Sequence, residues 1–243
     1  ARFSNHEKAS MKAYYYFSDR GLPSNKLYNS RATERLKDNN FFAQANYENK
    51  FSDRWSLLTN GKFNWGYNKY SNPDNATYNA ATENNYYQNE YYLSGTIMYR
   101  PSPLLSFSLA NDGSINTMRA DMANFAYPTR FTLLNAFAAK YVNNRFTATA
   151  HILSTLTRES VKTGTAADNR NRLSPSVSLS YQPIKKENLR LRLRYKDILR
   201  LPTFNDLYYG TIGTRTLKPE QASEYSAGVN WIKNINHIIP FVS

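Results

Sequence analysis

The sequence predicts an all-β protein, and more narrowly part of a transmembrane antiparallel β-barrel. Two observations carry this prediction. Apolar and polar side chains alternate along one segment after another, and short and long connections alternate between the segments. Successive side chains of a strand point to opposite faces, so each segment would build a sheet with one apolar and one polar face. Either a protein core or a lipid bilayer must then cover the apolar face.

The alternation is clearest in residues 189–196, where leucines and a tyrosine occupy the odd positions and basic residues the even ones. Ten segments with strand patterns follow one another along the chain. They span residues 8–18, 39–48, 54–67, 90–100, 103–112, 130–142, 145–158, 172–182, 188–197 and 221–231. Pro175 interrupts one of them, and a proline inside a strand is expected to mark an edge or a bulge.

The connections between these segments alternate strictly in length. The short ones are Asn49–Asp53, Pro101–Ser102, Asn143–Asn144, Pro183–Glu187 and Ile232–Asn236. The long ones are Asp19–Asp38, Asn68–Asn89, Asp112–Thr129, Arg158–Asn171 and Ile198–Gln221. An outer-membrane barrel has this pattern because its periplasmic turns are tight and its outer loops are long. Long loops without structure of their own count against a compact soluble domain.

Aromatic residues flank the short connections and share the parity of the apolar positions. They are Tyr47, Trp55, Tyr99, Tyr141, Phe146, Tyr181 and Trp231. Rings at one height on a lipid-facing wall form an interfacial girdle. The alternative is that they are core aromatics of a soluble β-sandwich, but one parity rule holds on most of the strands at once.

Composition excludes several classes of protein and site. The 243 residues contain no cysteine, which excludes disulfides and thiolate metal sites. No run approaches the roughly 18 apolar residues of a membrane helix. The net charge of +13 is spread over loops and the polar face without a recognisable nucleic-acid-binding module, so we expect no nucleic-acid partner.

Three ordered pieces of sequence near the C-terminal end resemble the TonB-dependent outer-membrane receptors. The first piece contains Arg200, Pro202, Thr203, Phe204, Asn205, Leu207 and Tyr208; the second is Leu217, Lys218, Pro219 and Glu220; the third contains Glu224 and Gly228. Thr216 stands where the family usually has asparagine. Tyr14–Pro23, Asp38–Trp55 and Phe125–Arg130 look like the Bacteroidetes branch of that family, whose most similar members are cobalamin receptors.

The resemblance implies a section of a barrel of about 22 strands. Both ends read as cut from a longer chain, so we expect residues 1–243 to be a fragment of one barrel domain, without the plug domain or the C-terminal closing strand. The implied localisation is the bacterial outer membrane. The implied partners are the lipid bilayer with lipopolysaccharide, the receptor's own plug, TonB acting through the plug, and in some systems a surface lipoprotein.

The implied function is active import of a scarce nutrient, with cobalamin first and ferric siderophores or glycans behind it. No catalysis is expected. A different-class alternative is a closed ten-strand outer-membrane protease or lipase, but His6, His151 and His237 fall at different levels of the wall and form no Ser/His or Asp/His set. A passive pore or an adhesin is a further alternative.

Two sets of candidate site residues come from the predicted faces. The basic column Arg190, Arg192, Arg194 and Lys196 should line the lumen and pair with acidic groups of the plug; a track for an anionic ligand is the alternative. Tyr78, Tyr86, Tyr87, Tyr208 and Tyr209 are the candidate ligand-facing aromatics. The motif around Pro202 is expected to shape the outer rim. No cofactor is expected; calcium in the outer loop with Asp74, Glu83 and Glu90 is weakly supported, because no fixed ligand spacing is present.

Overall fold

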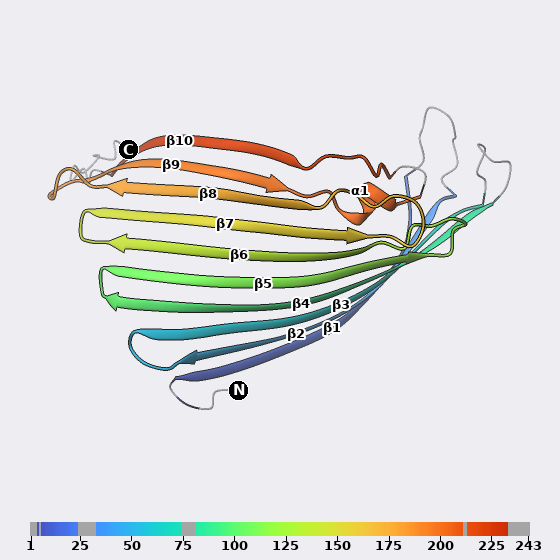
Figure 1. Ribbon diagram of the computed structural model, residues 1–243, viewed down its shortest axis with the longest axis horizontal. Helices are drawn as coiled ribbons and strands as arrows, with labels where there is room; N and C mark the ends of the chain where they lie inside the picture. The colour runs from blue at the N-terminus through green and yellow to red at the C-terminus, as the bar shows by residue number, and fades with distance from the viewer. Residues whose placement is uncertain (1–3, 5, 24–32, 74–80, 211–212, 233–243) are drawn as a thin grey trace, which may run out of the picture.

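A computed structural model describes residues 4, 6–23, 33–73, 81–210 and 213–232. Its strands form a single antiparallel sheet in which every strand pairs with its neighbours in sequence, from β1 at one edge to β10 at the other (Figure 1). All ten predicted strands are present. Their bounds are β1 Glu7–Gly21, β2 Arg35–Lys50, β3 Trp55–Asn72, β4 Thr82–Ser102, β5 Leu105–Ala120, β6 Thr129–Val142, β7 Phe146–Ser160, β8 Arg170–Tyr181, β9 Asn188–Arg200 and β10 Glu220–Ile232.

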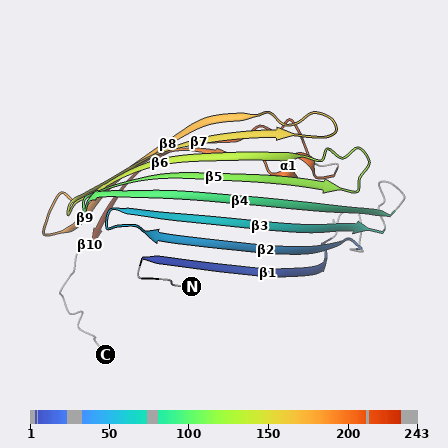
Figure 2. The ribbon, with the colours of Figure 1, turned by 60° about the horizontal axis from the view of Figure 1, so that its bottom comes forward.

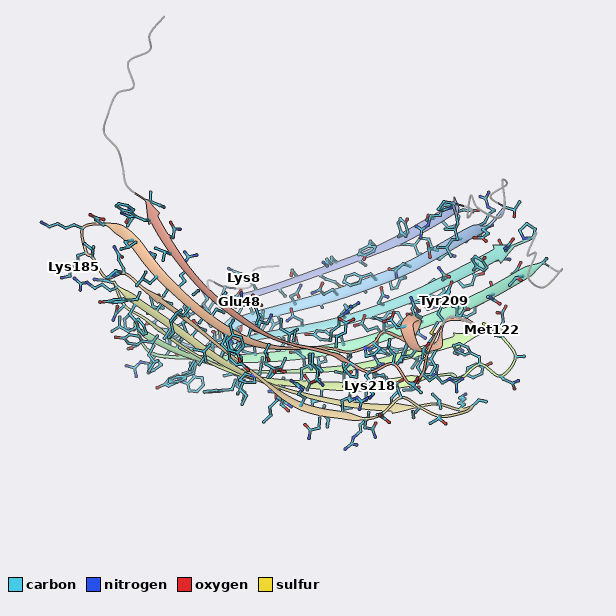
Figure 3. The ribbon with its side chains drawn as sticks, turned by 90° about the horizontal axis from the view of Figure 1, so that it is seen from above. Lys8, Glu48, Met122, Lys185, Tyr209 and Lys218 are labelled. Carbon is cyan, nitrogen blue, oxygen red and sulfur yellow. The ribbon has the colours of Figure 1, made fainter. Side chains whose placement is uncertain are left out.

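The sheet curves into a deep trough, and this confirms the prediction of a partial barrel (Figures 2 and 3). The tight connections lie at one end of the trough and the longer ones at the other (Figure 1). One short helix, α1 (Phe204–Tyr208), follows β9 and lies on the concave side (Figure 3). In the described part of the chain, no helix is long and apolar enough to cross a membrane.

The strands continue further towards the long-loop end than the sequence predicted. β4 begins at Thr82 instead of residue 90, and β5 ends at Ala120 instead of residue 112. Most of the predicted Asn68–Asn89 loop is therefore a hairpin extension. Alternation disappears where both faces of a sheet are polar, whereas backbone hydrogen bonding continues, so the pattern underestimates strand length there.

The convex face carries the apolar side chains, and the rings beside the short turns point outward from it as predicted. Trp55 and Tyr99, register partners on β3 and β4, stack with centroids 4.4 Å apart. Tyr141 and Phe146 lie 6.3 Å apart across the tight turn between β6 and β7. Large apolar side chains such as Leu93, which is 68% exposed, lie open on this face of the described sheet. An apolar wall of this kind requires a surrounding hydrocarbon phase.

The concave face is polar over most of its area, and its buried apolar cluster lies at the long-loop end around α1. The cluster consists of Tyr86, Met118, Ala120, Phe125, Ala126, Phe204, Leu207 and Tyr208. In the described residues, the buried apolar core is therefore the contact of one short helix with the inner wall and with the β5–β6 connection, and it fixes the position of that helix.

A seam separates the outer halves of β8 and β9. Their pairing runs only from Ser176 to Tyr181 on β8 and stops at Pro175, whose missing N–H cannot extend a ladder. Beyond it, Arg172 crosses to β9 and β10: its guanidinium donates to Asp197 at 2.9 Å and to Gln221. Side-chain hydrogen bonds thus replace backbone bonds where the proline ends the ladder.

Candidate ligand site inside the barrel

Helix α1 begins at a reciprocal cap. Thr203 is the N-cap, and its hydroxyl accepts a hydrogen bond from the Asp206 backbone N–H at 3.2 Å. The Asp206 carboxylate in turn accepts from the Thr203 N–H at 2.8 Å. This capping box satisfies two backbone donors that a helix of five residues cannot satisfy by itself. The hydrogen bonds from Thr203, first that of its backbone, hold the pKa of Asp206 below its usual range.

The helix is anchored to the wall by a buried ion pair. Arg130 on β6 and Glu159 on β7 are register partners, and Arg130 Nε lies 2.6 Å from Glu159 Oε2. Arg130 also donates to the carbonyl of Pro202 at 2.7 Å, and its guanidinium lies 5.0 Å from the centre of the Phe204 ring. The Tyr208 hydroxyl donates to the other oxygen of Glu159. Burial, and then this hydrogen bond, raise the pKa of Tyr208 to about 12.

From this anchor the segment crosses the trough to β3 and β4. The Gln88 amide donates to Asn205 at 2.9 Å, and the Tyr209 hydroxyl donates to Asn68 at 3.3 Å. The Tyr209 ring stacks on Tyr86, with centroids 4.3 Å apart. Figure 3, in which Tyr209 is labelled, shows this crossing on the concave side. The segment after β9 is thereby held against strands on the far side of the wall.

A cavity of about 910 Å³ lies between this crossing segment and the inner faces of β1–β4. Its lining is rich in carboxamides and tyrosines and includes Tyr14, Tyr16, Asn40, Asn64, Gly66, Asn68, Gln88, Asn205 and Tyr209. A concave site with a few converging polar groups is the kind of surface that binds a small molecule. We take this cavity as the candidate ligand site.

Comparison with known proteins decides the family. The family model "TonB dependent receptor-like, beta-barrel" matches residues 2–237. The chain belongs to the TonB-dependent receptor β-barrel family. No curated protein sequence matches this receptor barrel.

Solved structures share the fold of the receptor barrel at low sequence identity. The FrpB iron transporter from Neisseria meningitidis matches with a TM-score of 0.72 and 12% identity, over 96% of this chain and 40% of its own. BauA, the ferric preacinetobactin receptor from Acinetobacter baumannii, gives 0.65 and 10%, over 93% and 42%. Unliganded FecA, a ferric citrate transporter, gives 0.59 and 10%, over 94% and 39%. This chain thus spans about two fifths of the length of these proteins.

The candidate tyrosines occupy different environments in the receptor barrel. Tyr86 and Tyr208 are 1% and 5% exposed, so their observed contacts are with protein. Tyr87 lies on the convex face, where its ring packs 5.0 Å from Tyr67, and it therefore points away from the lumen. Tyr86 and Tyr209 are the described candidates that line the cavity, and of these two Tyr209 is the one with a partly exposed side chain. Tyr78 lies outside the described residues. That Tyr209, which lines the cavity, contacts a ligand stays a prediction.

The basic column Arg190, Arg192, Arg194 and Lys196 lies on the concave face of β9. Serines of β8 flank it on one side, with Ser176, Ser178 and Ser180 in register with Lys196, Arg194 and Arg192. On the other side Glu224 of β10 is in register with Lys196. None of the four side chains forms an ion pair with another described residue. Their pairing with a plug stays a prediction.

The family motif divides into an anchored part and an exposed part. Phe204, Leu207 and Tyr208 are buried, whereas Arg200 forms an exposed ion pair with Glu220 at 3.1 Å. Leu217 is 46% exposed, and Lys218 and Pro219 border a groove beside the β8–β9 seam. The first part of the motif is therefore a packing element on the inner wall, rather than a feature of the outer rim alone.

The acidic residues considered for calcium do not converge. Glu83 and Glu90 point to opposite faces of β4, where they pair with Lys69 at 2.6 Å and Lys62 at 2.8 Å. Asp74 lies outside the described residues. Within the described ranges, no group of three or more His, Asp or Glu side chains could hold a metal ion. His151 is in register with Ser176 but forms no hydrogen bond within the described chain, so these two residues assemble no catalytic set.

The residues that organise the site were not apparent from sequence patterns. Arg130 ended a family-like block, but its pairing with Glu159 was not predictable because it depends on the β6–β7 register. Asn40, Asn68 and Gln88 lay in or beside predicted loops. Their signal was parity: each occupies an even position, as Asn64 on the polar face does.

Proposed function

We propose that this chain is part of the barrel of an active transporter in the bacterial outer membrane, which imports a scarce nutrient by a TonB-dependent mechanism. The observation that carries the proposal is the family match over residues 2–237. The polar trough with a cavity at its long-loop end supports it, because an importer needs a ligand site on the side where ligand enters.

The complete protein, in this proposal, has a barrel of about 22 strands, of which residues 1–243 form one section. A plug domain fills the lumen, and TonB acts on the plug. The basic column on β9 faces that plug, and carboxylates of the plug neutralise it. The apolar convex face contacts lipid, with lipopolysaccharide in the outer leaflet, and a surface lipoprotein could cover the long loops.

Cobalamin is the proposed ligand, on the overall similarity of the chain to cobalamin receptors of the Bacteroidetes branch, which Tyr14–Pro23 and Asp38–Trp55 resemble. Ferric siderophores are the second candidate class, because the similar structures FrpB, BauA and FecA are described as an iron transporter, a ferric preacinetobactin receptor and a ferric citrate transporter. Glycans are the third. A barrel protease or lipase has no support in the contacts of His151.

Transport is tested in a Gram-negative strain that lacks its own cobalamin receptor and depends on external cobalamin. The full-length receptor should restore growth on nanomolar cyanocobalamin when TonB is present and should fail to do so in a strain without TonB. Growth that persists without TonB would instead indicate a passive pore. If neither cobalamin, nor a ferric chelate, nor a glycan supports growth in the strain with TonB, the transporter proposal is contradicted.

A further inference from the structure

We propose that the cavity between β1–β4 and α1 binds an uncharged ligand that presents hydroxyl or amide groups beside a flat face, and that it discriminates against anionic ferric chelates. This inference rests on the proposed function and narrows its substrate class. It is argued from the chemistry of the lining.

Carboxamides dominate the polar part of the lining. Asn40, Asn64 and Gln88 project from three adjacent strands, and Asn205 faces them from α1. Each carboxamide offers both donors and an acceptor, so a group of them complements hydroxyl and amide groups in either orientation. Asn40 and Asn64 make no hydrogen bond to other described residues, so both are available to a ligand.

Cations are missing from the described lining. Asp38 is the charged residue there, and it is paired with Arg20 at the rim, with Arg20 Nη2 and Asp38 Oδ2 3.0 Å apart. Lys62, in the next layer, is paired with Glu90. A ligand with several negative charges would lose its hydration in this cavity and would meet no counter-charge there. Hydrogen bonds to neutral amides do not offset the free-energy cost of this desolvation. The unpaired arginines of β9 lie in the short-turn half of the trough.

Aromatic rings supply the apolar part of the lining. Tyr14 and Tyr16 on β1 are 52% and 49% exposed, and Tyr209 faces the cavity from the opposite side. Tyrosine offers a flat apolar surface and loses little entropy when it is ordered. A ligand with a planar ring or the apolar face of a sugar would stack between these walls.

A glycine makes room for the ligand. Gly66 stands in register between Asn40 and Gln88 on the cavity floor, and a Cβ at this position would come no closer than 3.7 Å to the Asn40 amide. A larger side chain at position 66 would therefore occupy the cavity without striking the backbone. Gly61 on the same strand points to the convex face, where a Cβ meets nothing within 4 Å, and it provides a matched control.

The experiment measures binding to the full-length receptor in detergent by calorimetry, with cyanocobalamin, maltoheptaose and ferric citrate as probes. We expect one of the two neutral probes to bind with micromolar or better affinity and ferric citrate to bind at least 100-fold more weakly. Gly66→Leu should weaken binding of that neutral probe at least 100-fold, and Gly61→Leu should leave it within twofold of wild type.

A milder pair of variants guards against misfolding of Gly66→Leu. Asn64→Ala removes one unpaired amide and should weaken binding about tenfold, since a hydrogen bond contributes about 1.4 kcal/mol in that case. Asn230→Ala removes an exposed amide from the short-turn half of the same face and should change nothing. Heat-modifiable migration on gels verifies the fold of all four variants.

Three results of the binding experiment would overturn the inference: ferric citrate binds more tightly than both neutral probes, neither neutral probe binds, or Asn64→Ala and a folded Gly66→Leu leave neutral-probe binding unchanged. If ferric citrate is the one tested ligand that supports TonB-dependent growth, the inference is overturned and the transporter proposal stands. Failure of every ligand to support TonB-dependent growth would contradict the transporter proposal itself.

Discussion

Arg130 and Glu159 face each other across β6 and β7, and together they tie the wall of the trough to the family motif. The Glu159 side chain is only 2% exposed, and its two oxygens accept from Arg130 and from Tyr208. The guanidinium also holds the Pro202 carbonyl. The position of α1 therefore depends on one buried carboxylate and its partners.

Removal of either partner of this ion pair should release α1. A buried charge that loses its partner costs about 3–5 kcal/mol, so Arg130→Gln or Glu159→Gln should strongly increase hydrogen exchange across residues 203–209. Arg200→Gln breaks an ion pair whose side chains are 67% and 72% exposed and is the control. It should cost no more than about 1 kcal/mol. Equal exchange in the Arg130 and Arg200 variants would contradict the anchoring role.

Gly213 should tolerate no side chain. A Cβ at this position would lie 2.7 Å from the backbone nitrogens of Tyr208 and Tyr209, and backbone cannot move aside cheaply. Gly213→Ala should therefore destabilise the end of α1 by about 1–3 kcal/mol, read as faster exchange of residues 205–209. Gly228→Ala, where nothing lies within 4 Å, should be neutral or slightly stabilising. Matching exchange in the two variants would show that the close contact is absent in solution.

The packing of Tyr208 should make the anchor sensitive to alkali. Burial raises its pKa to about 12 from an ordinary value of 10.0, so the folded state holds this proton more tightly than the unfolded state. The stabilisation is complete below pH 10 and is lost as the pH rises towards 12. The difference in tyrosinate absorbance between wild type and Tyr208→Phe should have its midpoint near 12 in the folded barrel and near 10 in denaturant. A midpoint near 10 in both states would contradict the buried environment.

The convex face should contact lipid chains. Trp55 is 46% exposed and stacks on Tyr99 beside a short turn. In vesicles of brominated phosphatidylcholine, its emission should be quenched, and more strongly by bromine near the headgroups than by bromine near the bilayer centre. The control is a tryptophan at lumen position 60 (Asn60→Trp) in a background with Trp55, Trp65 and Trp231 changed to phenylalanine. Quenching of this control as strong as that of Trp55 would contradict the assignment of faces.

Most of the fold was predictable because one physical rule governs it. Side-chain parity located all ten strands and the outward direction of Trp55 and Tyr99, and tight turns fixed the order of pairing. Strand ends at the long-loop side were not predictable, since polar residues occupy both faces over most of Thr82–Asn89 and no alternation results. The ladder there is held by backbone hydrogen bonds, which do not depend on the alternation of side chains.

The site was less predictable, because it depends on contacts between residues far apart in sequence. α1 is too short for a helical period, although Thr203 and Asp206 spell a capping box three residues apart. Pro175 was recognised as an interruption, but the replacement of its ladder by Arg172 and Asp197 required the structure. The pairing of Gln88 with Asn205 follows from no local pattern.

The reach of the segment after β9 has a consequence for the order of assembly. Asn205 and Tyr209 meet partners 117 and 141 positions earlier in the chain. Hairpins between neighbouring strands close small loops and form early, whereas contacts of such long range must wait until the intervening chain is in place. The sheet can therefore form before α1 is in place, and the docking of α1 is the late event that completes the cavity.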